Sequence, residues 1–287
     1  MADFFNVGDT VARKSYNMDV IFKITEINGE NANLAGLTVR ILADSPLYDL
    51  IKVEKENIER VNNKIEDRCL EVIKNRNVMY KNTYYNVMKE ELNQYMKQDV
   101  PRSYIKTGVI LHLDGDKEYA DKCRILYSRL GINNYVYYVK EEEQPKCVYA
   151  LLEKIKPNIL VLTGHDALKK RTHDIYDINN YKNSRYFAEA VLEARRYEHN
   201  LDSLAIFAGA CQSYYEAIIT AGANFASSPK RVLIDVMDPI IVAENIAMTP
   251  VDRYVKLNGI IMNTREGIKG IGGVQTRGMA REGLPKF

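Results

Sequence analysis

Two apolar runs that each end in a reactive side chain decide the fold. The first is NILVLTGHD at residues 158–166, and the second is LAIFAGACQS at residues 204–213. Short apolar runs bounded by turn-forming residues are typical of strands buried on both faces of a parallel sheet. Function in such a sheet collects beyond the carboxyl ends of the strands. His165 and Cys211 each follow such an end, so we expect them at one edge of the sheet.

Strands and helices alternate outward from these two runs. Apolar runs predict further strands, and helical spacing predicts helices. The expected strands are 109–113, 135–139, 158–162 and 204–207, and the expected helices are 117–130, 145–155, 184–198 and 212–221. Repeated β-α units of this kind predict an α/β domain over residues 105–262, a doubly wound, mostly parallel sheet flanked by helices.

The rest of the chain has a different character. Residues 1–60 alternate apolar and polar positions between turns such as Asn28-Gly29, which predicts a small all-β, SH3-like barrel. Residues 61–104 are highly charged with apolar positions near helical spacing, so a helical connector is expected. Residues 263–287 are rich in glycine and arginine and are expected to be a flexible tail.

Composition excludes few classes of protein. The 40 basic and 38 acidic residues give a net charge of +2, which favours neither a nucleic-acid nor a membrane partner. No apolar run approaches the roughly 18 residues of a membrane span, and the first residues lack a basic leader, so a soluble cytoplasmic protein is expected. Cys69, Cys123, Cys147 and Cys211 show no disulfide or zinc-finger spacing. No cofactor and no metal is expected.

The pair His165 and Cys211 has the composition of a nucleophilic dyad. Small residues at 208–210 leave room for a substrate backbone beside the thiol. A helix beginning near Gln212 would lower the pKa of the Cys211 thiol and offer backbone N–H groups to an oxyanion. The alternative is an inert buried thiol, to which we assign the other three cysteines. The occurrence of both side chains at strand ends on one sheet edge, with glycine close to each, favours catalysis.

Three blocks of sequence resemble one family. Residues 7–16, 162–166 and 207–213 are similar to the YabG family of sporulation-specific proteases of spore-forming Firmicutes. The resemblance implies a cysteine peptidase that trims spore coat and germination proteins after basic residues, with His165 and Cys211 at the catalytic positions. It also implies a place in the mother cell and the spore coat.

A wider resemblance is to caspase-type peptidases, which implies a caspase-like sheet. In those enzymes one strand ends in His-Gly, whereas this chain has Gly164-His165. The backbone N–H of either Gly164 or Asp166 is therefore expected to join that of Cys211 at the oxyanion.

Cleavage after Arg, or Lys, requires a carboxylate in the pocket that binds that side chain, because an unpaired cation is costly to bury. Asp114 and Asp116 follow the first strand of the α/β domain and rank first, Asp235 and Asp238 second, and Asp166 third. Asp116 alternatively caps the helix that follows it. Asp166 is also placed to orient His165.

The tail carries Arg265, Arg277 and Arg281, which we interpret either as self-cleavage sites or as part of an arm that fills the cleft; a disordered terminus is the alternative. The sequence leaves the oligomeric state open.

Other functions have weaker support. Asp114 and Asp116 would suit a Mg²⁺-dependent phosphoryl-transfer enzyme, but the chain has no P-loop. His165, His173 and Cys211 would suit zinc, but lack the usual spacing. A third possibility is a binding module whose barrel, with Lys14, Lys23 and Arg40, docks RNA or a protein.

Overall fold

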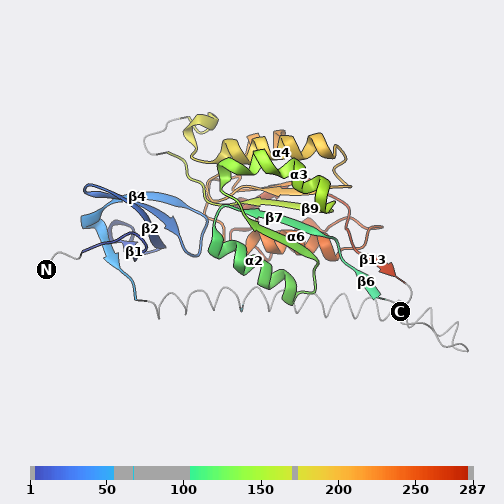
Figure 1. The fold of residues 1–287 in the computed structure, drawn as a ribbon, viewed down its shortest axis with the longest axis horizontal. Coiled ribbons are helices and arrows are strands. Elements are labelled where there is room, and N and C mark those ends of the chain that lie inside the picture. Colours follow the sequence, from blue (N-terminus) through green and yellow to red (C-terminus); the bar gives the residue numbers. More distant parts are fainter. Residues whose placement is uncertain (1–3, 55–66, 68–103, 170–173, 284–287) are drawn as a thin grey trace, which may run out of the picture.

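The computed structural model describes residues 4–54, 67, 104–169 and 174–283. Nearly all of the expected connector at 61–104 lies outside these residues. Within the described chain, a small β-sheet domain lies at one end of a larger α/β domain (Figure 1). Among the described residues no helix is long and apolar enough to cross a membrane.

The α/β domain is built on a six-stranded sheet in the order β12-β11-β10-β9-β7-β8. Its strands are β7 (Ile110–Asp114), β8 (Asn134–Tyr138), β9 (Ile159–Thr163), β10 (Ala205–Ala208), β11 (Phe225–Ser227) and β12 (Ile271–Gly273). The first five run parallel, and β12 is antiparallel to β11. Every residue of β7, β9 and β10 is buried, which explains their unbroken apolar runs. The expected mostly parallel sheet is confirmed.

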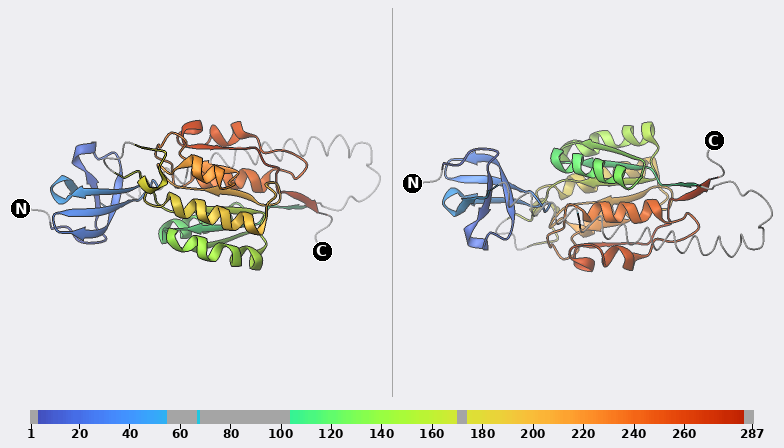
Figure 2. Two further views of the ribbon diagram at one scale, coloured as in Figure 1. Left: turned by 90° about the horizontal axis from the view of Figure 1, so that it is seen from above. Right: turned by 90° about the horizontal axis from the view of Figure 1, so that it is seen from below.

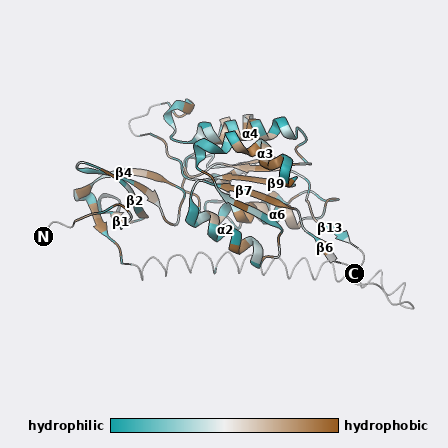
Figure 3. Cartoon of the chain, viewed as in Figure 1, coloured by the Kyte–Doolittle hydropathy of each residue, from teal (hydrophilic) through white to brown (hydrophobic). Residues whose placement is uncertain are grey.

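Helices cover both faces of this sheet. Figure 1 shows α3 and α4 on one face and α2 and α6 on the other. The helices are α2 (Lys117–Arg129), α3 (Gln144–Ile155), α4 (Ser184–Tyr197), α5 (Tyr215–Thr220), α6 (Asp238–Met248) and α7 (Leu257–Ile261). Alternate strand residues point to opposite faces: Val161 and Phe207 join the core with α2 and α6, whereas Leu162 and Ile206 join the core with α3 and α4. Figure 3 shows the hydrophobic strands between helices whose outer faces are hydrophilic.

The N-terminal domain is an antiparallel sheet in the order β4-β3-β2-β1-β5. Its strands are β1 (Thr10–Arg13), β2 (Ile21–Asn28), β3 (Asn31–Gly36), β4 (Leu42–Pro46) and β5 (Leu50–Lys52). Phe22 and Leu34 belong to a hydrophobic cluster that also contains Cys211 and Ile234 of the α/β domain. The two domains therefore share packing at the edge of the sheet beyond β9 and β10, and both views of Figure 2 show the small domain at that end.

The tail differs from the expectation of a flexible arm. The sheet gains β12 as its antiparallel edge strand, and β13 (Arg281–Gly283) pairs with β6 (Tyr104–Lys106). Thr276 and Ala280, between these strands, are buried. Short strands with few large apolar side chains give almost no periodic signal, which is why this stretch reads as a loop in the sequence.

Five short 3-10 helices complete the described elements. They are η1 (Lys14–Tyr16), η2 (Leu47–Asp49), η3 (Glu141–Glu143), η4 (Ile178–Asn180) and η5 (Gly267–Lys269).

Candidate active site

His165 and Cys211 lie in loops that leave the same edge of the sheet. β9 and β10 are adjacent and parallel, with Ala208 opposite Leu162, so the two loops begin at the same level. The Asp166 carboxylate ties the loops together, because it accepts hydrogen bonds from Ser184 Oγ (2.5 Å) and Ser213 Oγ (2.9 Å). Asp166 is thus engaged between the loops, and its predicted role in orienting the imidazole has no support in these contacts.

Cys211 is fully buried. Its Sγ accepts a hydrogen bond from the Ile234 N–H (3.1 Å) and also lies 3.4 Å from the Ile234 carbonyl oxygen. The following residue, Gln212, makes a left-handed turn with φ 54°, and α5 begins only at Tyr215. Burial raises the pKa of the Cys211 thiol to about 12. The expected helix at 212–221 is therefore shorter, and the expected lowering of the thiol pKa is wrong for this conformation.

His165 is also enclosed, with 4% of its surface exposed. Its ring stacks on Tyr119 with 5.3 Å between centroids, and Nε2 lies 3.1 Å from the Gly36 carbonyl oxygen. Burial lowers the pKa of His165, which favours the neutral ring. Burial thus favours the neutral form of both the imidazole and the thiol.

Two backbone N–H groups beside these side chains converge on one oxygen. The Arg40 carbonyl oxygen accepts hydrogen bonds from the N–H of Cys211 (3.1 Å) and the N–H of Asp166 (3.3 Å). Of the two amides expected to join that of Cys211, the Asp166 amide is the one with this contact. Gly164 leaves room for a neighbouring side chain instead, since a Cβ there would overlap the Glu141 carboxylate.

Among the predicted acidic residues, Asp114 contacts a buried cation. Its Oδ2 lies 2.8 Å from Arg40 Nη1, and both side chains are fully buried. Burial alone would raise the pKa of Asp114, but the Arg40 guanidinium, His112 and the Asp116 N–H together outweigh burial and hold the pKa well below the usual range. The guanidinium also lies over the Tyr119 ring, 4.8 Å from its centroid. Asp114 and Tyr119 therefore form a binding site for a guanidinium group.

The other acidic candidates have different partners. Asp116 caps α2 by accepting a hydrogen bond from the Tyr119 N–H (3.0 Å). Asp238 is buried and accepts from the N–H groups of Asp235 and Arg265 (both 2.9 Å), and burial followed by the nearby Asp235 raises its pKa to about 7. Asp235 forms an isolated antiparallel bridge with Val39.

Sequence reasoning missed Glu141. Its carboxylate accepts a hydrogen bond from the His165 N–H (2.7 Å) and lies against the bare Cα atoms of Gly115 and Gly164. Burial raises the pKa of Glu141 to about 7. The only signal in the sequence is a glycine shortly after each of two neighbouring strands, which marks a close approach without saying what approaches.

Similarity to known proteins places the chain in a family. The YabG peptidase U57 family matches residues 6–285. The chain belongs to this family. It is also 40% identical over 291 aligned residues, covering 98% of both chains, to the sporulation-specific protease YabG of Bacillus subtilis (strain 168). The resemblance noted from the sequence is confirmed, and the chain is a sporulation-type protease that acts on proteins.

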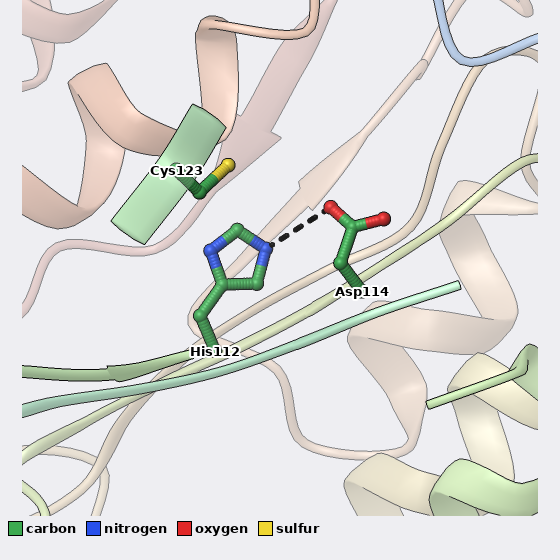
Figure 4. Close-up of side chains that lie close together, drawn as sticks. All are labelled: His112, Asp114 and Cys123. Carbon is green, nitrogen blue, oxygen red and sulfur yellow. Dashed lines mark ion pairs between the residues drawn. The ribbon is translucent and has the colours of Figure 1, made fainter. Parts of the chain in front are cut away.

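In this YabG-family protease another histidine, His112, lies close to Cys123. His112, Asp114 and Cys123 offer ligand atoms within 4.8 Å of one another, and Figure 4 shows His112 pointing at Asp114 (3.5 Å) with Cys123 beside it. His112 is fully buried within β7. Its Nε2 is hydrogen-bonded to Thr163 Oγ1 (2.6 Å) and its Nδ1 to Tyr127 Oη (3.2 Å). Burial raises the pKa of Cys123 to about 12.

The cluster of His112, Asp114 and Cys123 binds the Arg40 guanidinium, which leaves it unsuited to a metal ion. Arg40 Nη2 lies 4.0 Å from Cys123 Sγ, so a permanent positive charge already occupies the cluster. The alternative Mg²⁺ site at Asp114 and Asp116 has the same difficulty, because one carboxylate pairs with Arg40 and the other caps α2. His173 of the alternative zinc site lies outside the described residues.

The arginines proposed as self-cleavage sites lie on folded backbone. The Arg265 N–H donates a hydrogen bond to Asp238 Oδ1, and the Arg277 N–H donates one to Asp202 Oδ1 (both 2.9 Å). Arg281 pairs with Lys106 across β13 and β6. Cleavage at any of the three would require local opening of this part of the protein.

Proposed function

We propose that this protease is a cysteine endopeptidase that cleaves after arginine, with Cys211 as nucleophile and His165 as base. One observation carries the proposal. An arginine, Arg40, has its carbonyl oxygen between the N–H groups of Cys211 and Asp166 and its guanidinium on Asp114. A substrate arginine bound in this way would present its carbonyl carbon beside the thiol.

The contacts support a mechanism of acyl transfer. His165 accepts the thiol proton, and the Cys211 thiolate attacks the carbonyl carbon that follows the arginine Cα. The N–H groups of Cys211 and Asp166 stabilise the oxyanion, which is typically worth about 2.7–4 kcal/mol for each donor. His165 then protonates the leaving amine, and water hydrolyses the acyl-enzyme to regenerate the thiol.

The guanidinium site supports specificity for Arg over Lys. Asp114 is held by Thr163 Oγ1 (2.9 Å) in a buried pocket, with the Tyr119 ring along one side. A planar guanidinium stacks on such a ring and keeps its charge when buried, whereas an ammonium ion loses its hydration at greater cost. We therefore expect Lys to be the poorer substrate, with Asp116, Asp235 and Asp238 outside direct contact.

The fold supports a caspase-like peptidase domain. The order β8-β7-β9-β10-β11-β12, with helices on both faces and one antiparallel edge strand, fits the caspase-like sheet expected from the sequence. Continuous antiparallel pairing from β4 to β5 supports an SH3-like barrel for the N-terminal domain. The name of the Bacillus subtilis relative, a sporulation-specific protease, supports a role in sporulation. We propose spore coat and germination proteins as the substrates, in the mother cell and the spore coat.

The test compares two active-site variants with a control thiol. Peptides ending in Arg, Lys or Asp before a fluorescent amine are incubated with wild-type protein and with Cys211→Ala, His165→Ala and Cys147→Ala proteins. Cys147 is a partly exposed thiol on α3, outside the contacts described for His165 and Cys211. We expect both active-site variants to lose at least about a thousandfold in kcat/KM for the Arg peptide, and Cys147→Ala to match wild type. Retained cleavage by Cys211→Ala would refute the proposal.

A further inference from the structure

We infer that residues 36–42, from the last residue of β3 to the first residue of β4, are a built-in inhibitor that fills the substrate cleft and keeps the protease latent. Arg40 takes the position of the residue after which a substrate is cut. This inference rests on the proposed function and adds how the same site is regulated. Residues 36–42 are called the inhibitory segment below.

The inhibitory segment pairs with the cleft on both sides of Arg40. Before Arg40, Val39 forms an antiparallel bridge with Asp235, and the Thr38 carbonyl accepts from the Val236 N–H (3.3 Å). After Arg40, the Leu42 N–H donates to the Asp166 carbonyl oxygen (3.0 Å). Added-strand pairing of this kind is a general way to bind an extended peptide, because the main chain supplies the hydrogen bonds. The segment thus occupies the path of a polypeptide substrate.

The Arg40 side chain gives this pairing its register. The guanidinium is fully buried and lies 2.8 Å from Asp114 Oδ2, although the two residues belong to different domains. A buried charge requires a partner, so Arg40 and Asp114 hold the N-terminal domain in one position against the sheet. The inhibitory segment is therefore bound through the same carboxylate that we propose for substrate arginine.

The geometry is that of an inhibitor rather than a cleaved substrate. The Ile41 N–H donates to the Val39 carbonyl oxygen (2.9 Å), which makes a tight turn about Arg40, and the Gly36 N–H donates to the Ile41 carbonyl oxygen (2.9 Å). The leaving amine would thus stay beside the acyl group and reverse the cut. His165 Nε2 contacts the Gly36 carbonyl oxygen, and Cys211 Sγ is held by Ile234.

Latency follows from the burial of both reactive groups. Cys211 has no exposed surface and His165 has 4%, so neither a protein substrate nor a small alkylating reagent reaches them while the segment is bound. Activation requires the segment to leave the cleft, and with it the β3–β4 end of the N-terminal domain.

The experiment uses the full chain with Arg40→Ala, Arg40→Glu and Lys52→Ala substitutions. Arg40→Ala removes the side-chain contact, and Arg40→Glu places a carboxylate against Asp114 and repels the segment. Lys52→Ala is the matched control, since Lys52 pairs with Asp9 on the outside of the same domain. Two rates are measured: cleavage of an Arg-ended peptide, and alkylation of Cys211 by iodoacetamide, mapped by mass spectrometry with Cys147 as internal reference.

We expect both Arg40 variants to gain at least tenfold in both rates, and Lys52→Ala to match wild type. In wild-type protein, Cys211 should be alkylated at least tenfold more slowly than Cys147. This comparison needs no variant, so it tests latency even if the Arg40 variants fail to fold. Wild-type alkylation of Cys211 as fast as Cys147 would overturn latency. So would cleavage of the Arg40–Ile41 bond in wild type but not in Cys211→Ala, because the segment would then be a substrate.

The outcomes separate the two proposals. In one outcome, Cys211 is alkylated faster in the Arg40 variants but these variants cut no peptide. That result would refute the proposed peptidase chemistry and would be consistent with latency. Wild-type protein that cuts as fast as the Arg40 variants, with Cys211→Ala inactive, would sink latency and leave the chemistry standing.

Discussion

At the scale of single residues, burial sets the charge of the catalytic candidates. Cys211 and His165 are both enclosed, and burial moves each pKa toward the neutral form of the side chain. Glu141 contacts the His165 backbone and is shifted by the same cause. In this conformation burial therefore favours the neutral forms of Cys211, His165 and Glu141, whereas Arg40 and Asp114 are charged and paired.

Glu141 should make stability depend on pH. Its folded-state pKa of about 7 lies above the ordinary 4.5, so its stabilising contribution is complete below about 4.5 and is lost as the pH rises to about 7. We expect the unfolding free energy of wild type to fall relative to Glu141→Gln by at most about 3 kcal/mol between pH 4.5 and 8. Urea unfolding across this range measures it, with Glu142→Gln on the same turn as control. Parallel curves for wild type and Glu141→Gln would contradict the assignment.

At the scale of elements, α2 links the guanidinium site to the imidazole. Its first turn supplies Tyr119, whose ring stacks on His165 and lies beneath Arg40, and whose hydroxyl donates to the Gly36 carbonyl oxygen (2.7 Å). The start of α2 is fixed by Asp116. A residue predicted as a substrate contact thus acts on the site through the helix that it caps.

Asp116→Ala should therefore affect stability more than specificity. Loss of a cap costs about 1 kcal/mol, within a range of roughly 0.5–2. We expect that loss in urea unfolding, while the ratio of kcat/KM for Arg over Lys peptides stays within about twofold of wild type. Asp121→Ala, further along α2, where Asp121 forms a half-exposed pair with Arg124, is the control. A collapse of the Arg preference in Asp116→Ala would instead make Asp116 part of the pocket.

At the scale of the whole molecule, two charge pairs join the domains in different surroundings. Arg40–Asp114 is fully buried, whereas Lys23–Glu118 (2.6 Å) is about half exposed. Removing one partner of a buried pair leaves an uncompensated charge, while solvent weakens an exposed pair. The buried pair should therefore couple the domains far more strongly.

A pair of double-mutant cycles measures this difference. We expect Arg40→Met and Asp114→Asn each to cost about 3–5 kcal/mol of unfolding free energy, and the double variant to cost less than their sum by at least about 2 kcal/mol. The same cycle on Lys23→Ala and Glu118→Ala should give a coupling below about 1 kcal/mol. Additive losses for Arg40 and Asp114 would mean that the two side chains do not stabilise one another.

The sequence by itself determined the α/β sheet and the edge where His165 and Cys211 emerge. Strands buried on both faces of a parallel sheet are continuous apolar runs, and the residue at which each run stops marks the end of its strand. It also placed Asp114, together with Asp116, among the candidate carboxylates for a basic side chain, since a strand end fixes where a carboxylate lies. The tertiary structure alone decided that Arg40 fills this site, that Glu141 supports His165 and that β12 closes the sheet. These contacts join segments far apart in the chain, and no local pattern records a partner that arrives from another domain.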